Sequence, residues 1–170
     1  YFRMYGHQNQ LDPLFLASLG FQESMLNQNA ISPTGAVGVM QLLPSTGDSL
    51  GVGNIHLLEP NIHAGAKYMS SLLYALSIQG DLSDIERNFF GVAAYNAGPN
   101  NIRKARDLAK TMGFDPNKWF DNVEMATTKL FGIETFLYVR SVYKYYVVYD
   151  IRQRNIPIFQ ENLIPDRLIK

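Results

Sequence analysis

The chain has 170 residues, enough for one domain that buries a substantial core. Hydrophobic residues make up 46% and charged residues 18%, a composition that indicates a folded globular protein and excludes a disordered one. Fifteen basic and fifteen acidic residues cancel, so the chain lacks the basic surplus of a nucleic-acid-binding protein and we expect no nucleic-acid partner.

Cysteine is absent, which excludes disulfides and thiolate chemistry. The three histidines, His7, His56 and His63, have no metal-binding helical spacing, so we expect neither a metal nor another cofactor. No apolar run is long enough to span a membrane, and no signal peptide is visible. Because the chain starts at Tyr1, we expect a mature form or a domain excised from a longer protein.

The first strong helix signal follows a polar and aromatic segment, residues 1–11, for which we expect a short helix ahead of the main body. Asp12 is a suitable N-cap and Pro13 suits the first helical turn. Glu23 falls in the last part of this helix, where a carboxylate is held more rigidly than on a loop. The apolar positions of the helix are Leu14, Phe15, Leu19, Phe21 and Met25.

The stretch from Glu23 to Pro44 contains a Ser-Pro-Thr-Gly turn, a run of small residues and then Met40-Gln41. Because its side chains are small and it contains two glycines and a proline, this stretch is not expected to form part of a hydrophobic core. It indicates backbone that approaches a ligand closely, with one acid above it. We expect this ligand to be a sugar chain.

Four further helices are predicted before residue 114, each bounded by capping and breaking residues. Their expected limits are Ser45 to Gly51, Pro60 to Gly80, Asp84 to Gly98, and Asn100 to Gly113. The second has an apolar stripe that faces the core, made of Ile62, Ala66, Met69, Leu73 and Leu76.

The last part of the chain opens with a short turn containing Trp119. A helix near 122–130 and a long one near 133–153 follow, and the two prolines of 154–170 predict an extended strap or a partly mobile tail. With no linker or repeat, the sequence predicts one all-α domain over 1–170, with its core at about 12–153.

Glu23 has two interpretations when it is taken alone. Beside Phe21 and Met25, its pKa would rise through desolvation, and it could donate a proton to a leaving group near neutral pH. The alternative, favoured from this residue alone, is a solvated glutamate at a helix end.

The motifs around Glu23 change this balance, because three ordered elements closely resemble the catalytic domain of family 1 lytic transglycosylases. These are lysozyme-like enzymes that cleave the glycan strands of bacterial peptidoglycan. The resemblance covers about 12–150 and is closest to the membrane-bound lytic transglycosylase F type. The elements are Glu23-Ser24, Ser32-Pro33, Gly35-Ala36, Gly38, Met40-Gln41 and Pro44, then Ala94 to Pro99, then Ile133 to Val139.

The resemblance implies a lysozyme-like fold and a non-hydrolytic reaction. Glu23 would protonate the oxygen between N-acetylmuramic acid and N-acetylglucosamine. It would then act as base on the muramoyl C6 hydroxyl, which closes a 1,6-anhydro ring. The substrate's own N-acetyl oxygen would stabilise the positive charge, so no second carboxylate is needed, whereas most glycosidases use two. The first acids after Glu23 are Asp48, expected to be solvated, and Glu59, expected to cap a helix.

Five further residues are implied as substrate-binding. Ser32 and Gln41 would bind the acetamido group or a sugar hydroxyl, or else stabilise the turn. Tyr95 would place its hydroxyl near the catalytic carboxylate, or else be a core tyrosine. For Glu134 and Tyr138, substrate contact and structural support both stay open.

Two positions depart from the family pattern. Leu43 stands where members commonly have a second methionine, which leaves the groove surface similar in shape but without sulfur. Phe136-Leu137 follows the Glu-Thr pair of the third element, where an arginine is frequent. We expect the second change to affect strand or stem-peptide preference and not cleavage.

The implied partner is the peptidoglycan glycan strand, in the periplasm and at the outer membrane through parts outside this chain. A preceding solute-binding-like domain with a regulatory role is also implied, and we expect a monomer. Two alternatives stay open. One is a hydrolase like goose-type lysozyme, with Asp48 positioning water; the other is a peptidoglycan-binding module without turnover.

Overall fold

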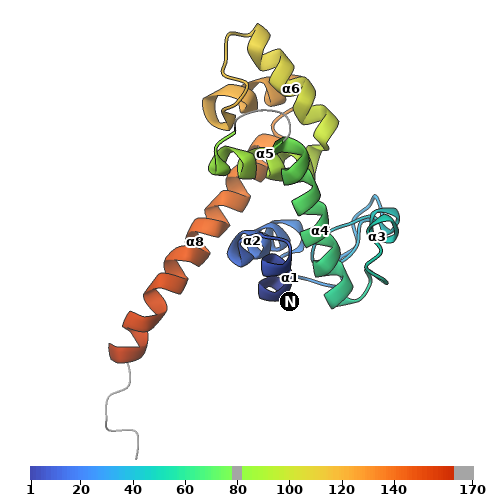
Figure 1. The fold of residues 1–170 in the computed structure, drawn as a ribbon, viewed down its shortest axis with the longest axis vertical. Helices are drawn as coiled ribbons and strands as arrows, with labels where there is room; N and C mark the ends of the chain where they lie inside the picture. Colours follow the sequence, from blue (N-terminus) through green and yellow to red (C-terminus); the bar gives the residue numbers. More distant parts are fainter. Residues whose placement is uncertain (78–81, 163–170) are drawn as a thin grey trace, which may run out of the picture.

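The computed structural model describes residues 1–77 and 82–162, and regular structure in these ranges is helical apart from two isolated bridges that Val37 makes with Ile31 and Leu42. Within these ranges, eight α-helices and one short π-helical turn, η1, are arranged as in Figure 1. They are α1 (Phe2–Gln8), α2 (Pro13–Ser24), α3 (Pro44–Leu50), α4 (Leu58–Ser77), α5 (Asp84–Ala97), α6 (Pro99–Thr111), η1 (Trp119–Val123), α7 (Glu124–Phe131) and α8 (Glu134–Asn162). The predicted all-α class is confirmed.

Helix α2 has the limits that its capping residues predict. The Asp12 carboxylate accepts the Leu14 N–H (2.8 Å), and Pro13 occupies the first turn. The helix ends at Met25, whose φ of 53° is left-handed. Glu23 therefore lies in the last turn, as predicted, and its backbone is fixed by the helix.

The N-caps of α5 and α6 differ from the predicted caps by one and two residues, respectively. Ser83, and not Asp84, is the N-cap of α5, because its hydroxyl accepts the Glu86 N–H (3.4 Å). Pro99 begins α6, ahead of the predicted cap at Asn100, because its fixed φ suits the first helical position.

Helix α4 begins at Leu58, two residues before Pro60, so the proline lies within the first turn, where its missing N–H costs no hydrogen bond. The predicted end at Gly80 lies outside the described residues.

The ends of the chain differ more from the prediction. Helix α8 continues to Asn162, so an extended strap from residue 154 is wrong up to that point, and residues 163–170 lie outside the described part. The prediction relied on Pro157 ending the helix, whereas α8 continues past it despite the missing N–H donor. The core also starts before residue 12: Tyr5 of α1 is buried and donates to Glu59 (2.9 Å).

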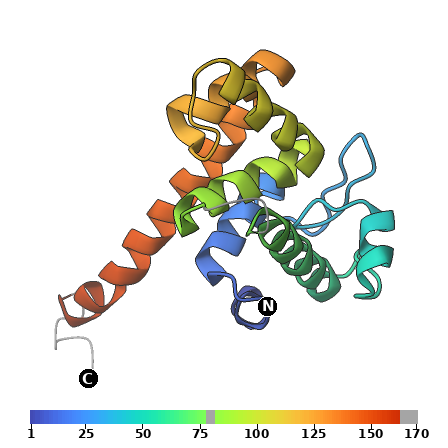
Figure 2. The ribbon, with the colours of Figure 1, turned by 45° about the horizontal axis from the view of Figure 1, so that its top comes forward.

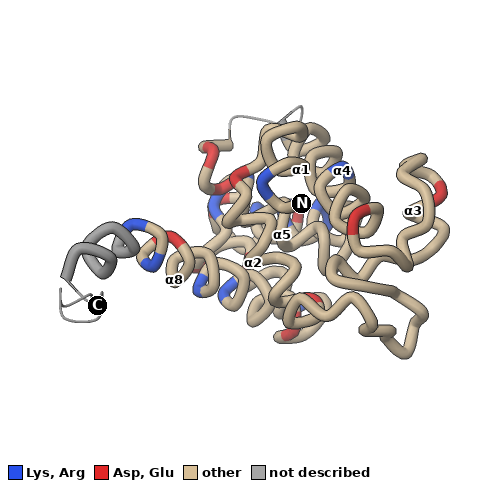
Figure 3. The backbone as a smooth tube through the Cα atoms, turned by 90° about the horizontal axis from the view of Figure 1, so that it is seen from below, with Lys and Arg blue, Asp and Glu red and all other residues tan. Residues whose placement is uncertain are grey.

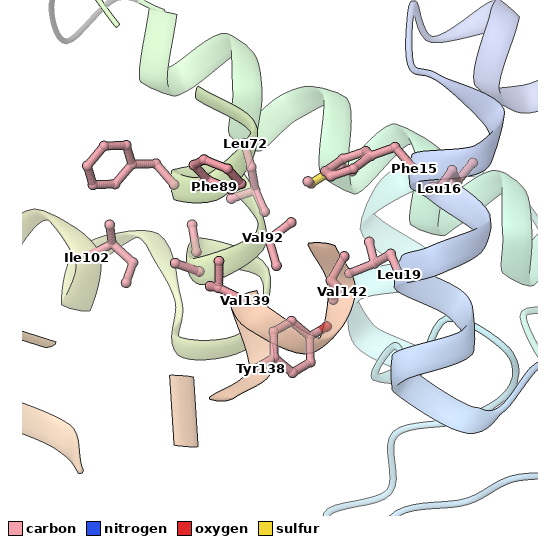
Figure 4. Packing of buried hydrophobic residues seen from close by; sticks show 14 of the residues in the cluster. Phe15, Leu16, Leu19, Leu72, Phe89, Val92, Ile102, Tyr138, Val139 and Val142 are labelled. Atoms are coloured by element: carbon pink, nitrogen blue, oxygen red, sulfur yellow. The ribbon is translucent and has the colours of Figure 1, made fainter. Parts of the chain in front are cut away.

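The core lies where α2, α5 and α8 meet. Leu16 and Leu19 of α2 are fully buried, as is Val142 of α8, and Figure 4 shows Leu19 and Val142 facing each other across this junction. The first half of α8 is held in this way against α2, whereas Figures 1 and 2 show its second half extending away from the other helices. In the described ranges, no helix combines the length and apolarity that crossing a membrane requires.

Arg106 joins α6 to the segment before η1 from a buried position. Its Nε donates to the Pro116 carbonyl (2.9 Å) and its Nη2 to Asn117 Oδ1 (2.7 Å). The guanidinium also lies over the Phe90 ring, 5.2 Å from its centre. One side chain thus satisfies the acceptors of an otherwise irregular segment.

We expect Arg106→Met to lower the free energy of unfolding by about 2–3 kcal/mol, because it leaves these acceptors without their charged donor. Urea unfolding followed by circular dichroism measures the change. Arg103→Met is the matched control, since Arg103 lies exposed on the same helix. A loss for Arg106→Met no larger than that of the control would contradict the assigned role.

Candidate active site

A pocket of about 280 Å³ opens beside the end of α2, and Glu23 is part of its wall. Four helices, α2 to α5, and the loop after α2 contribute to it. The lining residues are Glu23, Thr34, Ala36, Gln41, Leu42, Leu43, Thr46, Tyr68, Tyr95 and Asn96. The structure therefore brings Glu23, Gln41 and Tyr95 together, although they come from separate parts of the sequence.

The Glu23 carboxyl is largely withdrawn from water and is bound by one side chain of α8. Burial raises its pKa from 4.5 to about 7, and the hydrogen bond that Tyr138 donates to Oε1 opposes this rise. Burial also keeps the pKa of Tyr138 well above 10, so this hydroxyl stays a donor. Near neutral pH, Glu23 is thus poised between its acid and carboxylate forms.

The loop that follows α2 carries no charged residue that could shift the pKa of Glu23. Between Glu23 and Asp48 the sequence has no Lys, Arg, Asp or Glu. In Figure 3 the backbone between α2 and α3 is tan, the colour of uncharged residues, while the red and blue charged residues lie on the surrounding helices. The raised pKa of Glu23 therefore comes from desolvation and not from a neighbouring anion.

Tyr95 enters the pocket from the last turn of α5. Its hydroxyl donates to the Met40 carbonyl (2.8 Å), and its ring lies 5.2 Å from that of Tyr68. Burial raises its pKa well above 10, and the charge of Glu23 adds to the rise. With its proton engaged by Met40, the Tyr95 oxygen has only lone pairs to offer to the pocket.

Gln41 lines the pocket from a strained position, with a φ of 45°. Its Nε2 donates to the carbonyls of Gly38 (2.9 Å) and Ala30 (3.2 Å), which closes the loop on itself. The amide nitrogen therefore forms hydrogen bonds within the loop, and the amide oxygen remains available to bind a ligand.

Three predicted site residues lie outside the pocket lining: Tyr138, which still contacts Glu23, and Ser32 and Glu134. The Ser32 hydroxyl accepts the Ala36 N–H (3.0 Å) and pairs with the Thr34 hydroxyl (2.9 Å), which matches the turn-stabilising alternative. Glu134 is exposed at the start of α8. Next to it, the Thr135 hydroxyl donates to Asn96 Oδ1 (2.8 Å) and ties α8 to the end of α5.

The candidate second carboxylates are elsewhere. Asp48 is exposed on α3 and does not line the pocket. Glu59 lies in the first turn of α4 and accepts from Tyr5. Within the described ranges, His, Cys, Asp and Glu form no cluster that could hold a metal ion.

Sequence reasoning missed Asn61, the residue whose side chain holds the loop by hydrogen bonds. It is fully buried, its Oδ1 accepts the Met40 N–H (2.8 Å), and its Nδ2 donates to Val37 and Ile55 (both 2.9 Å). A signal was present: Asn61 shares a helix face with Met69, two turns later on the apolar stripe. A polar side chain at such a position needs buried partners.

Comparison with known proteins gives consistent matches. A family model described as the transglycosylase SLT domain matches residues 1–119. Membrane-bound lytic murein transglycosylase F of Ectopseudomonas mendocina is 40% identical over 120 residues, covering 71% of this chain and 24% of that protein. The protein of the same name from Marinobacter nauticus is 32% identical over 160 residues, covering 86% of this chain and 32% of that protein.

Solved structures match over most of the fold. The 70 kDa soluble lytic transglycosylase SLT70 from Escherichia coli has a TM-score of 0.67 at 25% identity, covering 89% of this chain and 24% of its own. An inactive mutant of lytic transglycosylase Slt from Pseudomonas aeruginosa has a TM-score of 0.67 at 23% identity, covering 90% of this chain and 24% of its own. The chain thus spans about a quarter to a third of the length of its relatives.

The raised pKa of Glu23 predicts a loss of stability with rising pH. Between its ordinary pKa of 4.5 and about 7, the folded state binds more protons at this group than the unfolded state, so unfolding becomes easier as pH increases. A difference of that size corresponds to about 3 kcal/mol. Glu23→Gln removes the group, so its stability relative to the wild type should rise by about 3 kcal/mol between pH 4 and pH 8.

Urea unfolding of both proteins at the two pH values measures this difference. Glu134→Gln, which removes an exposed carboxylate, is the control and should stay within about 0.5 kcal/mol of the wild type. A constant difference between Glu23→Gln and wild type at both pH values would show that Glu23 is not desolvated.

Tyr138→Phe should raise the pKa of Glu23 further, by about 1, because the hydrogen bond it removes favours the charged form. A ¹³C NMR titration of the Glu23 carboxyl measures it directly. Tyr149→Phe, farther along α8, should leave the value at about 7. An unchanged or lowered pKa in Tyr138→Phe would mean that this hydrogen bond is absent in solution.

Proposed function

The chain belongs to the transglycosylase SLT domain family, and on this premise we propose that it is a lytic transglycosylase that cleaves peptidoglycan glycan strands without consuming water. The bond cleaved is the β-1,4 link between N-acetylmuramic acid and N-acetylglucosamine. Glu23 acts first as general acid and then as general base. The relatives that share the domain are named lytic murein transglycosylases, which supports the substrate class.

The observation that carries the proposal is a single carboxyl group with a pKa of about 7 in an otherwise uncharged pocket wall. Glycosidases that use water, or a covalent intermediate, need a second carboxylate within about 5–10 Å on the other side of the sugar. The other lining residues described here are neutral. Such a pocket suits a reaction in which the substrate supplies its own nucleophile.

In the first step, protonated Glu23 gives its proton to the glycosidic oxygen, and the bond to C1 of the muramoyl residue breaks. Because Tyr138 donates to Oε1, the proton of the acid form resides on Oε2, which is then the oxygen that gives it to the leaving group. The substrate's N-acetyl oxygen stabilises the positive charge at C1.

In the second step, the Glu23 carboxylate takes the proton of the muramoyl C6 hydroxyl while that oxygen bonds to C1. The products are a 1,6-anhydromuramoyl end and a free N-acetylglucosamine end, and Glu23 is protonated again. Tyr138 holds the carboxylate between the two steps by its hydrogen bond. A pKa of about 7 lets the same group give and take a proton with similar ease near neutral pH.

The other residues have smaller proposed roles. Tyr95 offers an acceptor to a sugar hydroxyl or to the acid proton, and Gln41 offers its amide oxygen. Ser32 acts through the turn that carries Thr34 and Ala36 to the pocket wall. Glu134 is exposed at the start of α8, so its role is contact with a strand that extends beyond the pocket.

For the longer protein, we propose a periplasmic location with attachment to the outer membrane through parts outside this chain. The name of the relatives, membrane-bound, supports the attachment. The additional length of those relatives supports a further domain, for which we propose a regulatory role.

Mass spectrometry of the products released from purified sacculi tests the proposal. The wild type should release anhydromuropeptides, and Glu23→Gln should lower their rate of release by about 10³-fold or more. Asp48→Asn, which alters an exposed acid outside the pocket, should retain the wild-type rate. Reducing-end muropeptides would instead indicate a hydrolase, and binding to sacculi without release would indicate a module that lacks turnover.

A further inference from the structure

The carbonyl of Met40 is the acceptor on which the Tyr95 hydroxyl depends (2.8 Å). It belongs to a loop in which Gly38 and Gln41 both have positive φ, at 78° and 45°. Such backbone is not set by a helix or a sheet, so something else must fix the direction of this carbonyl.

Two residues on one face of helix α4 hold Met40 in place. The Asn61 amide accepts the Met40 N–H (2.8 Å) and also holds the loop at Val37 (2.9 Å). One turn later, Gly65 leaves room for the Met40 side chain: a Cβ at Gly65 would lie 2.6 Å from Met40 Cγ and Cε. Met40 itself is fully buried, so water does not compete for its backbone groups.

The loop also fits the helix closely from its own side. A Cβ at Gly38 would lie 2.4 Å from Asn61 Nδ2, so only glycine lets the backbone approach the amide this closely. Asn61 holds the main chain of Met40, and Gly65 packs against its side chain. Both parts of Met40 are therefore fixed in place. We call Asn61 and Gly65 the Met40 socket.

We propose that the Met40 socket is a positioning element of the active site: it holds the Met40 carbonyl so that the Tyr95 proton points away from Glu23. This rests on the proposed function, in which Glu23 must carry a proton of its own. A hydroxyl has one proton and two lone pairs. While the proton binds Met40, the lone pairs can accept from protonated Glu23 or from a sugar hydroxyl.

Displacement of the Met40 carbonyl would reverse this arrangement. The Tyr95 proton could then turn to the Glu23 carboxylate, stabilise the charged form and weaken the acid. The other titratable groups at Glu23 are Tyr138 of α8, which already donates to it, and Tyr68 of α4, which shares the pocket wall. Neither contacts the socket through a hydrogen bond described here.

Gly65→Ala tests the proposal, because it moves Met40 without removing a polar group. We expect the pKa of Glu23, followed by ¹³C NMR titration of the chain, to fall by about 1 and kcat for sacculus cleavage to fall by about 10-fold with KM little changed. Gly91→Ala is the matched control. A Cβ there would lie 2.5 Å from Leu73 Cδ2, a similar degree of crowding that does not involve Met40.

A double-mutant cycle with Tyr95→Phe separates positioning from general damage. If the socket acts through the Tyr95 hydroxyl, Gly65→Ala should lower the pKa of Glu23 in the wild-type background and leave it unchanged in the Tyr95→Phe background. An equal fall in both backgrounds, or no fall in either, would overturn the proposal.

Tyr95→Phe alone gives a second measurement that does not depend on the folding of the glycine variant. A phenol that accepts from Glu23 stabilises the acid form, so its removal should lower the pKa of Glu23 or leave it in place. A rise would mean that Tyr95 donates to Glu23, and would refute the proposal. The NMR results judge the socket even if no glycan is cleaved, whereas sacculus digestion by the wild type judges the proposed function.

Discussion

The removal of one carboxyl group from water is the constraint on which the site depends. A buried carboxylate is unfavourable unless hydrogen bonds replace its hydration, and Glu23 receives one such bond, from Tyr138. Two or three donors would have kept the group ionised, and none would have made the carboxylate too costly to form. With a single donor the pKa stays at about 7, where both forms are accessible.

This balance requires α2 and α8 to be held together rigidly, because a hydrogen bond to a buried carboxyl is sensitive to small displacements. The contact between Leu19 and Val142 lies one turn from Glu23 on α2 and one turn from Tyr138 on α8. The apolar packing of the fold and the polar contact of the site are thus parts of the same helix pair. Loss of packing there would change the pKa of Glu23 as well as the stability of the fold.

Local features of the fold were predictable, while the contacts that form the site were not. Asp12, Pro13 and Gly51 act within a few residues of their own positions, so α2 and α3 could be placed from the sequence. Tyr138 lies 115 residues from Glu23, and no local pattern indicates that their side chains meet. Motif resemblance named both residues without giving the direction of the bond. Asn61 was missed because a helical stripe predicts apolar residues, whereas this position binds backbone.

The same distinction explains why five of the six predicted site residues separate into two groups in the structure, while Glu134, exposed at the start of α8, belongs to neither. Those at the ends of α2, α5 and in the first turns of α8, Glu23, Tyr95 and Tyr138, converge because each is carried by a packed helix. Ser32 and Gln41 lie on a loop whose backbone needs internal donors and acceptors, and their side chains supply them. The side chain of a polar residue on such a loop therefore forms hydrogen bonds with the backbone. Only the groups that these bonds leave unused, a second lone pair or an amide oxygen, can bind a ligand. In a pocket built in this way the reactive group must come from a helix, and here Glu23 does.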